Sequence, residues 1–64
     1  MMNKVKEIRE KKGMSQEELK EKSGVSRTII SGLEMGKIEV ITNVTMERIA
    51  KALEEKVTVV FFQD

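Results

Sequence analysis

Residues 15–37 carry the stretch that decides the fold, SQEELKEKSGVSRTIISGLEMGK. Its start, Ser15 followed by Glu18, has the S-x-x-E pattern of a capping box, in which each side chain accepts a hydrogen bond from the other residue's backbone amide. This pattern predicts a helix that begins at Ser15 and ends near Lys22, with Leu19 on its inner face.

A second helix follows directly in the sequence. Gly24 suits the tight turn between the two helices because glycine readily adopts a left-handed conformation. Ser26 is a favoured N-cap residue and predicts a helix over about 26–35, with Ile30 and Leu33 on its inner face. Two short helices joined in this way can place the start of the second in the major groove of DNA while the first crosses the backbone.

The composition limits the kinds of site that the chain can build. Its 64 residues make one domain, which has no cysteine and no histidine. We therefore expect no disulfide, no metal site and no cofactor, and oligomerisation is the remaining aid to stability. Residues 1–37 hold nine Lys/Arg against six Glu, whereas residues 38–64 hold three basic against five acidic residues. The two central helices thus lie in the basic half, although such charge is also ordinary for a small helical domain.

Two more helices flank the central pair. Asn3 predicts the cap of a helix that runs to about Lys12, and Thr42 predicts the cap of one that ends near Glu55. The last helix has apolar residues at helical spacing on one face, namely Met46, Ile49, Ala50 and Leu53. Residues 37–41 form the loop before it.

The C-terminal residues 56–62, KVTVVFF, are β-branched and aromatic and predict a strand. A lone strand exposes unpaired amides, so we expect it to pair antiparallel with the same strand of a second copy. The predicted dimer interface is Val57, Val59, Val60, Phe61 and Phe62. A tail packed on its own helices and a disordered tail are the alternatives. The expected fold is mainly α, with a compact four-helix domain over 1–55 and a dimerising strand over 56–64.

Several spaced motifs of residues 5–53 resemble one known family. They are Ile8-Arg9, GMSQEEL over 13–19, SGVSR over 23–27, Ile30-Ser31, Leu33-Glu34-x-Gly36-Lys37 and IAKAL over 49–53. This text is similar to the helix-turn-helix domain of the Cro and phage-repressor type, the XRE family. The resemblance implies a lambda-repressor-like bundle of four or five helices whose second and third helices read DNA. The predicted strand would replace the fifth helix that is common in the family.

The resemblance also implies roles for individual residues. Gln16 matches a glutamine that typically bonds a DNA phosphate, and Arg9 and Glu34 match a pair that often forms a salt bridge. Base-contacting or phosphate-contacting side chains are implied on the third helix and just after it. The candidate DNA-binding residues are Gln16, Ser26, Arg27, Thr28, Ser31, Gly32 and Lys37. Gly32 departs from the family, because a long polar side chain often occupies its position.

The side-chain chemistry of several residues allows more than one role. Arg27 could donate two hydrogen bonds to a guanine, contact a phosphate or remain a solvated surface side chain. Gln16 lies at a helix start that favours an anion, but could be a plain helix-start residue. Ile29 could contact a thymine methyl group or rest against the preceding helix. Gly32 could allow close approach to DNA or be a tolerated surface glycine.

The sequence predicts a homodimeric, sequence-specific DNA-binding transcription regulator of repressor type, cytoplasmic and of prokaryotic or phage origin. The alternative is an antitoxin that binds a toxin and its own promoter, with the strand and the apolar loop residues Ile38, Val40 and Ile41 as the partner surface. An enzyme is not expected, because histidine and cysteine are absent and no Gly-rich phosphate loop follows a strand. No apolar run approaches the roughly 20 residues of a membrane span.

Overall fold

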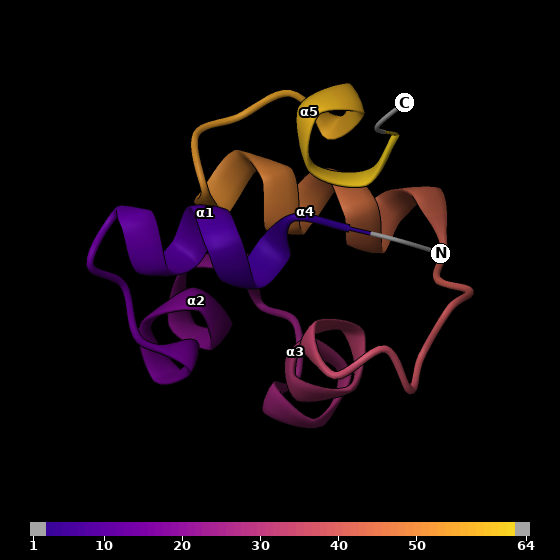
Figure 1. Ribbon diagram of the computed structural model, residues 1–64, viewed down its shortest axis with the longest axis horizontal. Coiled ribbons are helices and arrows are strands. Elements are labelled where there is room, and N and C mark those ends of the chain that lie inside the picture. The colour runs from indigo at the N-terminus through magenta and orange to yellow at the C-terminus, as the bar shows by residue number, and fades with distance from the viewer. Residues whose placement is uncertain (1–2, 63–64) are drawn as a thin grey trace.

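The computed structural model describes residues 3–62 and consists there of five helices packed around one core (Figure 1). The helices are α1 (Val5–Lys11), α2 (Gln16–Ser23), α3 (Arg27–Glu34), α4 (Asn43–Ala52) and α5 (Val57–Phe61). Residues 1–2 of the predicted domain over 1–55 and residues 63–64 of the predicted strand segment over 56–64 lie outside the described residues.

Local capping chemistry sets the helix starts much as the sequence predicts. Ser15 and Glu18 form the complete capping box of α2, and Ser15 Oγ accepts from Glu18 N at 3.0 Å. Thr42 caps α4 by accepting from the amide of Thr45 at 3.1 Å. Gly24 ends α2 with φ of 72°, a left-handed conformation that costs glycine little. These three predicted boundaries are confirmed. The predicted Asn3 cap is wrong, because Lys4 holds the cap position of α1, with no side-chain cap hydrogen bond.

The core brings all five helices together. Its largest fully buried side chains come from every helix and from the residue that ends α4, namely Val5, Leu19, Ile30, Leu33, Ile49, Leu53 and Val60. Helix α2 packs against both α3 and α4, and α1 packs against both α3 and α5. Figure 1 shows the α2–α3 unit on one side of α1 and α4, with α5 on the other side. Within residues 3–62, no helix combines the length and the apolar character needed to cross a membrane.

The predicted C-terminal strand is wrong, because residues 57–61 form the short helix α5. Val60 and Phe61 are buried, with 0% and 2% of their surface exposed, and the carbonyl of Val60 accepts from the amide of Lys4 at 2.8 Å. Val57 also packs against the core. The spacing of Val57, Val60 and Phe61 fits one face of a helix, and the core formed by α1 and α4 supplies the surface that this face buries.

The expected dimer has no structural basis here, because it required the strand. Its five interface residues, Val57, Val59, Val60, Phe61 and Phe62, do not form a ladder edge, and two of them are inside the protein's own core. The alternative of a tail that packs on its own helices is the one that holds. The chain therefore has the fifth helix that the resemblance implies. It does not depart from the family by having a strand at this position.

Candidate nucleic-acid interface

The outer face of α3 begins at a capped helix start. Ser26 Oγ accepts a hydrogen bond from Ile29 N at 3.2 Å, which fixes the first turn. Ser26, Arg27 and Thr28 are exposed there, and the side chain of Arg27 has 61% of its surface accessible. Ser31 follows one turn later and is half-buried. The polar residues expected to reach DNA thus share the accessible side of this helix.

The opposite side of α3 packs into the protein. Ile30 and Leu33 are buried, with 0% and 2% of their surface exposed. Ile29 is half-buried and packs against the core cluster, so the structure does not favour its contact with a thymine methyl group. The amphipathic pattern of α3 therefore separates its residues into a core side and an accessible side.

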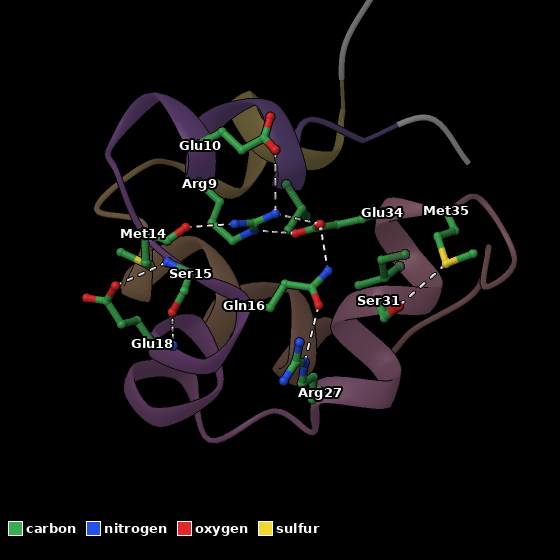
Figure 2. Close-up of polar contacts among 12 residues, drawn as sticks. Arg9, Glu10, Met14, Ser15, Gln16, Glu18, Arg27, Ser31, Glu34 and Met35 are labelled. Atoms are coloured by element: carbon green, nitrogen blue, oxygen red, sulfur yellow. Dashed lines mark hydrogen bonds and ion pairs between the residues drawn. The ribbon is translucent and has the colours of Figure 1, made fainter.

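An open hollow of about 540 Å³ lies beside α3. It gathers five of the candidate DNA-binding residues with two apolar neighbours, and its lining is Arg27, Thr28, Ser31, Gly32, Met35, Lys37 and Ile38. We call this surface the α3 hollow. Ser31 Oγ donates to Met35 Sδ at 3.5 Å (Figure 2), and 62% of the Met35 surface is exposed. The hollow thus joins cationic, hydroxyl and apolar groups on one surface.

Gly32 has a packing role that the sequence reasoning missed. It is buried, and a Cβ atom there would lie 2.5 Å from Ile38 Cδ1 and 2.7 Å from Ile38 Cγ1. The Gly32 carbonyl also accepts from the amides of Lys37 and Ile38, at 2.8 and 3.1 Å. The glycine therefore lets the segment after α3 fold back onto the helix, and neither expected explanation, close DNA approach nor a surface glycine, is needed.

A polar network connects the core to the start of α2. Arg9 Nε donates to Glu34 Oε2 at 2.7 Å, and Arg9 Nη2 donates to Glu34 Oε1 at 3.0 Å. Arg9 Nη1 also donates to the carbonyl of Met14 at 2.7 Å. Only 10% of the Arg9 side chain and 3% of the Glu34 side chain are exposed. The expected salt bridge is present as a buried, two-pronged pair that ties α1 to α3.

Burial and pairing act in opposite directions on Glu34. Burial raises the pKa of its carboxyl group because the charged form loses hydration. Hydrogen bonds from Arg9 and Gln16, together with the charges of Arg9 and Lys6, outweigh burial and leave this pKa below its ordinary value. The hydrogen bond to Glu34 raises the pKa of Arg9 in return, against the effect of its burial. Both groups are therefore charged at neutral pH.

Gln16 extends this network to the accessible face. Its Nε2 donates to Glu34 Oε1 at 2.9 Å, and its Oε1 accepts from Arg27 Nε at 3.3 Å. Figure 2 shows the side chain lying between Glu34 and Arg27, which come from the two ends of α3. Glu17, the next residue, places its Oε1 3.6 Å from Arg27 Nη1. The starts of α2 and α3 are thus linked through polar side chains.

Sequence reasoning identified the outer face of α3 but missed Glu17, Met35 and Ile38 as neighbours of it. Glu17 and Arg27 are on different helices, so no helical spacing relates them. The apolar loop at Ile38 did carry a signal, because loops are usually more polar.

The chemistry of the site is recognition by hydrogen bonds, charge and apolar contact. The interface offers one guanidinium, one ammonium, hydroxyl groups and a carboxamide, all on short helices or just after them. Among residues 3–62, no group of three acidic, histidine or cysteine side chains lies where it could hold a metal ion.

Comparison with known proteins agrees with this geometry. The sequence profile of a family described as helix-turn-helix matches residues 5–60, a range that includes α1 to α4 and most of α5. No curated protein matches the chain.

Proposed function

The chain belongs to the helix-turn-helix family of XRE type, whose members are DNA-binding transcriptional regulators, and from this premise we propose that it binds double-stranded DNA in a sequence-specific manner through α3. The start of α3 enters the major groove, and α2 lies across the sugar-phosphate backbone. The observation that carries the proposal is the joint exposure of Arg27, Thr28 and Lys37 around the α3 hollow, which the half-buried Ser31 also lines.

Each candidate residue has a role in this proposal. Arg27 and Thr28 contact base edges, and Ser31 contacts a base or a phosphate one turn later. Ser26 contributes through the cap that holds the first turn of α3. Lys37 neutralises a phosphate beside the helix. Gly32 makes no direct contact in the proposal, because it lies buried against Ile38.

Gln16 combines two roles in the proposal. Its Nε2 carries two N–H groups, one of which goes to Glu34. The second serves a phosphate oxygen that approaches the start of α2, where the helix dipole also favours an anion. The internal bonds of Gln16 hold its carboxamide in place before DNA arrives.

A single copy of the chain fills one major groove. Occupancy of promoter DNA would exclude other proteins from the same groove, which is a repressor-like action. The homodimer expected from the sequence required the C-terminal strand to pair with its copy. Residues 57–61 form the helix α5 instead. The toxin-binding alternative rested partly on the same strand, and two of its three loop residues, Ile38 and Ile41, pack against the core.

Selection from random duplexes at a stated salt concentration tests the proposal. We expect the wild-type chain to enrich a consensus sequence and Arg27→Ala to bind that consensus at least about tenfold more weakly. Arg48→Ala is the matched control, because Arg48 is an exposed arginine of α4 that lines a different hollow. An unenriched pool, or equal losses for the two variants, would contradict the proposal.

A further inference from the structure

The guanidinium of Arg27 is contacted from two directions before any DNA is present. Gln16 Oε1 accepts from Arg27 Nε at 3.3 Å, and Glu17 Oε1 lies 3.6 Å from Arg27 Nη1. Both partners belong to the first turn of α2. A long surface arginine normally samples many rotamers, and two contacts on different nitrogens restrict that freedom.

The first of these contacts is anchored in the core. Gln16 gives its Nε2 to Glu34 at 2.9 Å, and Glu34 is held by the buried Arg9 at 2.7 Å (Figure 2). Rotation of the carboxamide of Gln16 would break its bond to a carboxylate that is 3% exposed. The Nε side of Arg27 is therefore tied to the core through a chain of hydrogen bonds, whereas its Nη1 side faces the carboxylate of Glu17.

The second contact involves an exposed carboxylate with two cations. Glu17 Oε2 lies 3.4 Å from Lys20 Nζ, while its Oε1 faces Arg27. About half of the Glu17 side chain is exposed, so the pairs contribute little to folding stability. Their effect on Arg27 is nevertheless directional, because a carboxylate attracts one edge of the planar guanidinium.

The donor count indicates what this arrangement leaves for a ligand. A guanidinium carries five N–H groups in a fixed plane. Gln16 takes the donor on Nε, and Glu17 forms an ion pair at 3.6 Å beside Nη1, so donors remain on both Nη1 and Nη2. Two parallel donors match O6 and N7 of guanine. The negative charge of Glu17 would also repel a phosphate bound to Arg27, because the two negative charges would lie close together.

We propose that Glu17 is a specificity-determining positioning residue, which holds Arg27 in the orientation that reads a guanine and disfavours its use on a phosphate. The inference rests on the proposed function, because it requires that α3 enter the major groove. It predicts that loss of the Glu17 charge relaxes base selection and leaves general DNA affinity equal or higher.

The test compares Glu17→Gln with the wild-type chain on duplexes derived from the selected consensus. The informative guanine is the one whose replacement weakens the wild-type chain but not Arg27→Ala. Fluorescence anisotropy at fixed salt gives the ratio of Kd on the substituted duplex to Kd on the consensus. We expect a ratio of about ten or more for the wild-type chain, and a value near one for Glu17→Gln, whose Kd on the substituted duplex stays equal or falls.

Glu47→Gln is the matched control, because it removes the same charge from an exposed residue of α4 that borders a hollow with Val57 and Phe62. This variant should keep the wild-type ratio. A Glu17→Gln ratio equal to that of the wild-type chain overturns the inference and leaves the proposed function standing, as does a consensus without an Arg27-dependent guanine. A wild-type chain that selects no sequence overturns both.

Discussion

Glu34 is the residue at which the fold and the candidate interface meet. Its carboxylate accepts from Arg9 of α1 and from Gln16 of α2, although it belongs to the end of α3 itself. Arg9 and Gln16 are separated from it by 25 and 18 residues. One side chain therefore both closes the core and supports the residue that touches Arg27.

Removal of this carboxylate should destabilise the protein strongly. Glu34→Ala leaves the guanidinium of Arg9 buried, with the carboxylate of Glu10 3.9 Å away. We expect a loss of about 3–5 kcal/mol in the free energy of unfolding, measured by urea denaturation. Glu55→Ala, which removes a half-exposed pair with Lys12, should cost at most about 1 kcal/mol. Equal losses in the two variants would refute the structural role of the pair.

Acid should weaken the same pair. The pKa of Glu34 is lower in the folded chain than its ordinary value of about 4.3. The ionised Glu34 therefore contributes fully to the free energy of unfolding at pH values above that ordinary value. This contribution is lost as pH falls through the lower pKa that the group has in the folded chain. Glu34→Gln lacks this contribution at every pH. We expect the difference in unfolding free energy between the two proteins to narrow as pH falls below about 4.3, and a constant difference would contradict the shift.

At the scale of elements, local capping could be read from the sequence but the fate of the C-terminal segment could not. Ser15, Ser26 and Thr42 cap helices through bonds to residues three positions ahead. Such bonds depend only on neighbouring residues. Residues 57–61 depend instead on the distant surfaces of α1 and α4, and β-branched residues accept a helix where that conformation buries them.

The helical form of α5 makes a sharp prediction about two adjacent aromatic residues. Phe61 is 2% exposed and packs in the core, whereas Phe62 is 59% exposed. Phe61→Ala should cost about 3–5 kcal/mol of unfolding free energy. Phe62→Ala should change it by less than about 1 kcal/mol. Thermal or urea unfolding of the two variants measures these losses. Similar losses of unfolding free energy at both positions would argue against α5 as described.

The segment after α3 makes another prediction at this scale. Gly32→Ala places a Cβ atom against Ile38 but also favours a helix by about 1 kcal/mol relative to glycine. An Ile38→Ala background removes the two atoms at 2.5 and 2.7 Å and leaves the Cβ of residue 38 at 3.4 Å, so the helical gain outweighs the remaining contact. We expect Gly32→Ala to stabilise the Ile38→Ala protein and to be less favourable in the wild-type chain by at least about 1 kcal/mol. Additive effects of the two substitutions would remove the packing explanation for the glycine.

At the scale of the whole molecule, the family and the outer face of α3 could be predicted, since spaced motifs and caps fix both. The polar network could not be predicted beyond its Arg9–Glu34 pair. Gln16 and Arg27 are 11 residues apart and meet because the turn at Gly24 sets their two helices side by side. Such a contact depends on the angle between helices, which no short pattern encodes.

Charge near the hollow should govern how affinity responds to salt. Lys37 lines the α3 hollow and is exposed, and we assign it to a phosphate. Lys37→Ala should weaken binding to all duplexes by a similar factor and reduce the slope of log K against log salt by about one. Anisotropy titrations at several salt concentrations measure both. A changed base preference with an unchanged slope would instead assign Lys37 to a base.

The central claim is that the accessible face of α3 is the surface that meets DNA. Amide chemical-shift mapping of the ¹⁵N-labelled chain, titrated with the selected duplex, tests it most directly. We predict that the largest changes fall at residues 15–17, at residues 26–31 and at Lys37. Changes concentrated on α4 and α5, with those of α3 unmoved, would contradict the account.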